Sequence, residues 1–367
     1  MLETILLFLV LLSVLVFVHE LGHFFVARRM GMKVEEFGFG FPPRMFGVRR
    51  GETTYSVNWI PVGGFVRIKG ESGEHREDHD SFVSKSPWRR FLVLVAGVVM
   101  NLVLAAVLLW IGFLSGLPSV VSGSLPESAR VRDEAIRVVQ VVPGSAADLS
   151  GIKVGDRLLS VDDRVFEGAD DARAHLLQAD GSVRLLLERG DERFEKTVTK
   201  TALENGEPQV GVALVRTGLV SYGPLEAVWR SIEATGGLTI QVVVAFADVI
   251  VDLVTVGRPE VELAGPVGIA VMTSEVASLG FAFLLQFAAV LSINLAVINA
   301  LPFPALDGGR ILFLAMEKLR GRPVRGQTEA LAHNLGFLFL IGLVILVTYH
   351  DLARYGGDMI VFFRNLL

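Results

Sequence analysis

The stretch VFVHELGHFFVA, residues 16–27, places two histidines and a glutamate inside an otherwise apolar run. The run from about 4 to 27 is long enough to span a bilayer, which takes about 20 apolar residues. Ionisable groups inside such a span are costly and usually carry a function. On a helix, His19 and His23 are four positions apart and project from the same face. This stretch therefore predicts a membrane helix with a polar site on one side.

The composition supports a membrane protein. Hydrophobic residues make up 51% of the 367 positions, more than is usual for a water-soluble domain. The formal net charge is only -5 and no long basic run occurs, so nucleic acid is not expected as a partner. The chain has no cysteine, so any metal must be bound through nitrogen and oxygen atoms.

Four stretches are predicted to cross the membrane, at roughly 4–27, 91–117, 281–304 and 333–349. The first has neither a basic N-terminal region nor an A-x-A-like cleavage site, and we expect it to remain in the mature protein.

Lysine and arginine residues beside the spans predict the orientation, because they are retained on the cytoplasmic side. They cluster in two connections, between the first and second spans and between the third and fourth. They are Arg28, Arg29, Lys33, Arg89 and Arg90 in one, and Arg310, Lys318, Arg320, Arg322 and Arg325 in the other. We expect both connections in the cytoplasm, and both termini and residues 118–280 outside it.

A further apolar stretch, LTIQVVVAFADVIVDLVTV at 238–256, is not expected to span the bilayer. Its Asp248 and Asp252 would each cost about 2.5–3.5 kcal/mol in the membrane centre. Both share one helical stripe with Gln241, which predicts an amphipathic helix at the membrane interface. A fifth span would also move the basic loop at 310–325 outside.

An inserted soluble domain is predicted between the second span and this helix, at about 121–215. Short β-rich runs alternate with Gly, Pro and Asp turns, ADDARAHLLQA offers a short helix, and a hairpin surrounds the RGDE turn. About 95 residues are enough for a separate core. The pattern resembles a bacterial PDZ domain, most clearly in PGSAADLSGIKVGDRLLSVDD.

Residues 19–23 read H-E-x-x-H, which zinc metallopeptidases place on a helix with two histidine ligands and the glutamate beside the metal. The alternative is a buried histidine pair that hydrogen-bonds to other helices. Three ionisable residues within five positions of a span are hard to explain by packing, which favours the metal site. Counted from residue 5 at about 1.5 Å per residue, His19 lies about 21 Å into the hydrocarbon core, in the third nearest the cytoplasm.

A catalytic zinc needs a third protein ligand at a similar depth on another span. Asp307, in SINLAVINALPFPALDGGR, lies near the cytoplasmic end of the third span, where prolines and glycines break the helix. Irregular backbone at this depth needs protein or a water-filled cavity around it. The alternative is a simple Asp-Gly-Gly turn at a helix end. The other histidines fit less well: His75 and His79 in a polar loop, His175 in the outer domain, His350 at the far end of the last span, and His333 without a motif.

Together these motifs resemble the site-2 protease family, in its bacterial RseP-like branch of intramembrane zinc metalloproteases. The order matches over nearly the whole length: HELGH, a hairpin, a second span, a PDZ insertion, then NLAVINALPFPALDGG. The resemblance implies Zn²⁺ bound by His19, His23 and Asp307, with Glu20 as general acid and base. It also implies that Asn294 lies beside the substrate, although Asn294 and Asn299 could instead hydrogen-bond between helices.

The expected architecture is a polytopic α-helical membrane protein with four transmembrane helices, a membrane-associated β-hairpin at about 55–71 and an inserted α+β PDZ domain. The expected parts are a first membrane half at 1–117, an extracytoplasmic PDZ domain at 118–220, an interfacial helix region at 221–280 and a second membrane half at 281–367. GFGFPP, at 38–43, and AGPVGIA, at 264–270, also resemble the family but have no role that the residues reveal.

The resemblance implies a multi-pass protein of the bacterial cytoplasmic membrane that cleaves single-span proteins, such as anti-sigma factors, and remnant signal peptides. There is room for one PDZ domain, which could filter substrates by size, bind a peptide, or act as a spacer. Two other functions stay open. A membrane scaffold would tolerate Glu20→Gln, and a metal transporter would spread its ligands along a path.

Overall fold

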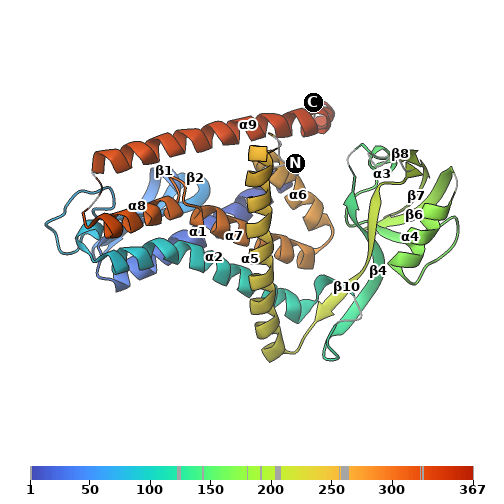
Figure 1. Ribbon diagram of the computed structural model, residues 1–367, viewed down its shortest axis with the longest axis horizontal. Coiled ribbons are helices and arrows are strands. Elements are labelled where there is room, and N and C mark those ends of the chain that lie inside the picture. The colour runs from blue at the N-terminus through green and yellow to red at the C-terminus, as the bar shows by residue number, and fades with distance from the viewer. Residues whose placement is uncertain are drawn as a thin grey trace. The chain divides into compact units, whose positions relative to one another are not determined.

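The computed structural model describes residues 2–121, 125–142, 144–179, 181–190, 192–202, 208–255, 257, 264–322, 324 and 326–366 (Figure 1). Arg325 of the second basic connection lies outside these residues. The chain divides into two compact units. The first comprises residues 1–108, 231–275 and 287–367, and the second comprises 109–230 and 276–286.

Seven helices of 13 residues or more occur in the described part of the chain, most of them on apolar stretches of the sequence. They are α1 (Leu2–Arg29), α2 (Pro87–Ser115), α5 (Pro224–Thr255), α6 (Pro266–Ser278), α7 (Phe281–Ala300), α8 (Asp307–Arg320) and α9 (Gly326–Leu366). The HELGH motif lies within α1, as predicted. The third predicted span ends earlier than expected, at Ala300, because Pro302 and Pro304 cannot continue the helix.

The expected count of four transmembrane helices is not confirmed. Five described helices are long and apolar enough to cross a membrane, and α5 is the additional one. The stretch predicted to lie at the interface is only the second part of α5, which already begins at Pro224. Large apolar side chains such as Val243, Val244 and Ile250 are exposed along α5.

The hairpin is larger than the sequence predicted. It consists of β1 (Val34–Arg50) and β2 (Thr53–Ile68), so it includes the GFGFPP stretch. The strands bend so that residues 36–39 pair with 64–67 on one side and with 54–57 on the other. Residues 64–68 therefore form an edge, and this edge packs against α1.

Close packing explains the glycines of β1. A Cβ atom at Gly38 would lie 2.4 Å from the Phe65 ring and 2.8 Å from Ser56 Oγ. The glycine-rich sequence looks like that of a loop, but glycine at position 38 is what allows three neighbouring strand segments to pack closely. Around α1, buried residues of the hairpin and neighbouring helices form one apolar core. Its members include Phe24, Ala27, Val34, Phe37, Ile68, Val93 and Leu314.

The second unit contains a six-stranded sheet in the order β3-β10-β4-β5-β6-β7, with α4 packed against β5 and β10 (Figure 1). The short helix and the hairpin about RGDE form as predicted, as α4 and as the β6–β7 pair. The elements are β3 (Leu117–Val120), β4 (Arg130–Val141), α3 (Ala146–Leu149), β5 (Arg157–Val161), α4 (Ala169–Gln178), β6 (Ser182–Arg189), β7 (Glu192–Thr199), β8 (Thr201–Ala202), β9 (Pro208–Gln209) and β10 (Val212–Ser221).

The sheet and its helices enclose their own apolar core. It includes Val138, Leu158, Val161, Val183, Leu185, Leu187 and Leu214. We call residues 117–221 the inserted domain.

Candidate metal centre

Three predicted ligands lie together although Asp307 is 288 positions from His19. His19 Nε2 is 3.0 Å and His23 Nε2 is 3.3 Å from Asp307 Oδ2, and the two Nε2 atoms are 3.2 Å apart. The side chains are 7%, 8% and 17% exposed for His19, His23 and Asp307. These three residues form the one group of metal-binding side chains found in the described part of the chain. Two imidazole nitrogens and one carboxylate oxygen suit zinc and leave a fourth position for water.

A main-chain contact fixes the orientation of His23. Its Nδ1 lies 2.8 Å from the carbonyl oxygen of Val93 on α2. A carbonyl oxygen only accepts, so Nδ1 carries the ring proton and donates it to Val93. Nε2 is then the unprotonated nitrogen, which is the form that binds a metal.

Asn101, also on α2, holds the second histidine. The amide nitrogen of Asn101, Nδ2, lies 3.2 Å from His19 Nδ1, and Asn101 is fully buried. When Nε2 of His19 binds a metal, Nδ1 carries the proton and needs an acceptor. Asn101 Oδ1 is a buried oxygen without a hydrogen-bond partner in the described residues. A flip of the amide, which exchanges Nδ2 and Oδ1, would turn this acceptor toward a metal-binding His19.

Asp307 is the first residue of α8 and follows a short irregular connection after α7. Its Oδ2 is the carboxylate oxygen that faces both histidine Nε2 atoms. A carboxylate that stays ionised is the form that binds a cation.

Glycines next to the ligands permit this close approach. A Cβ atom at Gly97 on α2 would lie 2.5 Å from His23 Nε2 and 2.6 Å from His19 Nε2. A Cβ atom at Gly308 would lie 2.2 Å from the Leu301 carbonyl oxygen. The glycines of the LDGG sequence thus allow α8 to pack directly on the connection before it.

Glu20 comes from the same helix as the two histidines and is held by the hairpin edge. Its Oε2 accepts a hydrogen bond of 3.1 Å from the backbone N–H of Val66 in β2. Glu20 as a whole residue is partly buried.

The structure does not bring the other candidates to this triad. The Asn294 amide donates to the Val290 carbonyl oxygen of its own helix at 2.9 Å, and within the described residues it makes no hydrogen bond to the triad. His333 accepts a hydrogen bond from the Ala305 N–H at 2.8 Å. His75 lies 3.5 Å from Asp78 in the polar loop, as expected for a solvated residue.

Sequence reasoning missed two residues of the site, Asn101 and Val93. Asn101 could have been found from the sequence, because it is a polar residue within the second span, where an amide without a partner is costly. No side-chain signal marks Val93, since its contribution is a backbone carbonyl.

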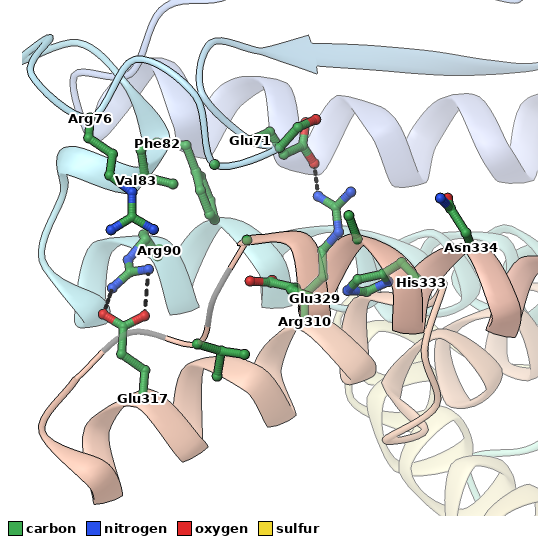
Figure 2. A pocket seen from close by; sticks show the side chains of 15 residues that line it. Glu71, Arg76, Phe82, Val83, Arg90, Arg310, Glu317, Glu329, His333 and Asn334 are labelled. Carbon is green, nitrogen blue, oxygen red and sulfur yellow. Dashed lines mark hydrogen bonds and ion pairs between the residues drawn. The ribbon is translucent and has the colours of Figure 1, made fainter.

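A polar cavity of about 430 Å³ lies on the α8 side of the first unit (Figure 2). Arg90 and Glu317 form a two-bond ion pair in its wall, with distances of 3.0 and 2.6 Å. Arg310 pairs with Glu71, which follows the hairpin. His333 lines the same cavity.

Known proteins are similar to this chain, two of them over nearly its whole length. The family model described as Peptidase family M50 matches residues 7–343. The protein CPE1693 of Clostridium perfringens is 37% identical over 343 residues, which cover 93% of this chain and 96% of that protein. The regulator of sigma-W protease RasP of Bacillus subtilis is 30% identical over 436 residues, which cover 96% of this chain and 99% of that protein. A PDZ domain of an SdrC-like protein from Listeria innocua is 18% identical, with a TM-score of 0.20, and covers 22% of this chain and 92% of its own.

Proposed function

The chain belongs to peptidase family M50, the site-2 proteases, and we propose that it hydrolyses peptide bonds of single-span membrane proteins within the bilayer. Membership confirms the resemblance deduced from the motifs, and with it a zinc metalloprotease in a multi-pass bacterial membrane protein. The observation that carries the proposal is the convergence of His19, His23 and Asp307 from two helices.

We assign His19, His23 and Asp307 as the zinc ligands and Glu20 as the general acid and base. Zinc, when bound, acts as a Lewis acid that activates water and polarises the scissile carbonyl. Val93 keeps the ring proton of His23 on Nδ1. Asn101 would do the same for His19 once its amide oxygen is turned toward His19 Nδ1, so that both Nε2 atoms face the metal position. Glu20 takes a proton from the attacking water and later delivers it to the leaving amine.

A helical substrate must unwind before it can be cut, because its carbonyl groups are bonded within the helix. The outer edge of residues 64–68 lies beside α1 and offers backbone groups to an extended segment. We propose that the substrate adds to this edge as a strand. Entry of substrate would release the Val66 N–H from Glu20, which frees the carboxylate for catalysis.

Asn294 is proposed to contact the substrate backbone. Its amide donor is engaged with Val290 in the structure, and its oxygen is the group left to accept a hydrogen bond. This role requires the substrate to reach the face of α7 on which Asn294 lies.

The physiological substrates are proposed to include anti-sigma factors and remnant signal peptides. The Bacillus subtilis relative is named for regulation of sigma-W, and this chain covers nearly the whole of that relative. Cleavage of a single-span regulator near the cytoplasmic side would release a cytoplasmic fragment.

The orientation is proposed from the basic residues. Both basic connections lie in the cytoplasm if α5 rests at the interface, which its Asp248 and Asp252 favour. The inserted domain and both termini are then extracytoplasmic.

The inserted domain is proposed to contact substrates through a groove between α4 and β10. The groove has a volume of about 350 Å³ and is lined by Leu176, Leu177 and residues 209–214. This groove favours peptide binding over a spacer role. A size filter would require no such groove.

The decisive experiment measures zinc content and cleavage of a single-span model substrate by the detergent-solubilised protein. We expect Glu20→Gln to retain zinc and lose cleavage, and Asp307→Ala to lose both. Cleavage at the wild-type rate by Glu20→Gln would exclude the proposed mechanism and favour a scaffold. Wild-type zinc content in Asp307→Ala would exclude Asp307 as a ligand.

A further inference from the structure

We propose that His333 on α9 is a positioning residue for the metal site, acting on Asp307 through the backbone of Ala305. This inference rests on the proposed assignment of Asp307 as a zinc ligand. His333 belongs to neither the H-E-x-x-H motif nor the LDGG sequence, and it lies 26 positions beyond Asp307 along the chain.

The first observation is the backbone of Ala305. Its φ angle is +80°, in the left-handed region that residues other than glycine rarely adopt. Ala305 is two positions before Asp307, in the connection between α7 and α8. A chain in this conformation persists only when its surroundings hold it. The direction in which α8 begins therefore depends on what fixes Ala305.

His333 supplies that contact. The backbone N–H of Ala305 donates a hydrogen bond of 2.8 Å to His333 Nδ1, across 28 positions of the chain. The ring of His333 packs against Phe313 of α8, with ring centroids 5.5 Å apart. The same side chain thus contacts both the connection and the helix that starts with Asp307.

A second, independent contact joins α9 to this connection. A Cβ atom at Gly336 would lie 2.4 Å from the Pro304 carbonyl oxygen, so only glycine allows α9 to come this close. Gly336 is three positions after His333 and faces the same side of the helix. Two neighbouring residues of α9 therefore hold Pro304 and Ala305 in place.

The tautomer of His333 follows from its partner. An N–H group donates, so Nδ1 must be unprotonated and the ring proton lies on Nε2. His333 Nε2 is buried and has no hydrogen-bond partner in the described residues. The side chain lines the polar cavity that also contains Arg310 and Glu71 (Figure 2). His333 therefore functions as an acceptor toward Ala305, and its second nitrogen is not used by the peptidase mechanism.

The expected consequence is on metal affinity. Replacing a residue that orients a metal ligand typically weakens metal binding by about 10- to 100-fold. His333→Phe keeps a ring against Phe313 and removes the acceptor. His333→Asn keeps an acceptor oxygen near the position of Nδ1. We expect affinity to fall by about tenfold or more in the phenylalanine variant and to recover by most of that factor in the asparagine variant.

The experiment titrates Co²⁺ into the metal-free full-length protein in detergent and records both the dissociation constant and the absorption spectrum of the bound ion. His350→Phe, on the same helix but exposed and distant in sequence, is the matched control. The positioning role is established if His333→Phe binds Co²⁺ more weakly and alters its spectrum. His333→Asn should reverse both changes, and His350→Phe should show neither. Wild-type affinity and spectrum in His333→Phe would overturn it.

The variant Asp307→Ala separates this inference from the proposed function. If Asp307→Ala loses Co²⁺ binding while His333→Phe does not, Asp307 is a ligand and His333 does not position it. If Asp307→Ala binds Co²⁺ as tightly as the wild type, the ligand assignment itself fails, and the positioning role is overturned with it.

Discussion

The carboxylate of Glu20 accepts a hydrogen bond from the backbone N–H of Val66, at 3.1 Å. Glu20, the proposed general acid and base on α1, is thus hydrogen-bonded to the hairpin edge that we propose receives substrate. An arriving peptide strand and Glu20 would compete for the same donor. This competition links substrate binding to release of the carboxylate.

Removing this one donor should slow cleavage. Val66→Pro eliminates the N–H, and a single hydrogen bond contributes about 0.5–1.5 kcal/mol, so cleavage of a single-span substrate should fall by roughly 2- to 10-fold. Zinc content should stay unchanged. Val66→Ala keeps the N–H and serves as the control. Equal cleavage rates for the proline and alanine variants would contradict strand addition at this position.

Gly97→Ala should abolish tight metal binding. The added methyl group would lie 2.5 Å from His23 Nε2 and 2.6 Å from His19 Nε2, closer than non-bonded atoms approach. We expect a loss of zinc affinity of at least about tenfold, as for other changes that displace ligands. Gly342→Ala, where a Cβ atom has open space, is the matched control. Competition with a chelator measures the zinc affinity of both variants, and normal affinity in Gly97→Ala would show that the site accommodates the methyl group and does not need this glycine.

The sequence predicted the parts of the site that depend on side-chain chemistry and helical spacing. His19 and His23 could be paired because four positions on a helix fix their common face. Asp307 could be suggested because an acidic residue at a broken span is costly unless it has a partner. Geometry alone brought Asp307 within 3.0 Å of His19, since no local pattern encodes a contact across 288 positions.

The sequence could not predict contacts made by backbone or by the absence of a side chain. Val93 contributes a carbonyl oxygen, and Gly97 contributes space. The sequence predicted a hairpin only at about 55–71 and so omitted its first strand, β1. GFGFPP has the composition of a loop, whereas Gly38 is needed for strand packing. The sequence does not fix the number of spans. The length and apolarity of α5 favour a span, whereas its Asp248 and Asp252 favour a position at the interface.

The AGPVGIA stretch has a structural role that the residues did not reveal. The backbone N–H groups of Gly265 and Gly268, at the start of α6, donate to the buried carboxylate of Asp351 on α9 at 3.2 and 2.7 Å. Asp351 is 3% exposed, and a negative charge at a helix N-terminus is favourable. A Cβ atom at Gly265 would lie 2.7 Å from this carboxylate, which explains the glycine.

Asp351→Ala should therefore destabilise the first unit. Two buried N–H groups would lose their acceptor, at a cost of about 1–3 kcal/mol. Loss of helical circular dichroism on heating in detergent should occur at a lower temperature than in the wild type. Asp248→Ala, which removes an exposed carboxylate from α5, should leave the transition unchanged. Identical transitions for both variants would show that Asp351 is not needed to hold α6.

The ion pair between Arg310 and Glu71 connects the end of the hairpin with the first turn of α8. Arg310 lies three positions after Asp307, and the charge of Glu71 raises the pKa of its guanidinium. Because both partners are partly buried, removing either one leaves a charge without its partner. The pair should therefore keep the proposed substrate edge and the proposed ligand Asp307 in fixed positions relative to each other.

A double-mutant cycle tests this connection. Glu71→Gln and Arg310→Met should each reduce cleavage, and their combination should cost less than the sum, with a coupling of about 0.5–3 kcal/mol. The exchanged pair Glu71→Arg with Arg310→Glu should recover part of the activity. The exposed pair of Arg184 and Asp163 in the inserted domain is the control, where removal of either charge should change stability by less than about 1 kcal/mol. Strictly additive losses of cleavage for the Glu71 and Arg310 variants would mean that the two side chains act separately and that the hairpin and α8 are not held together by this pair.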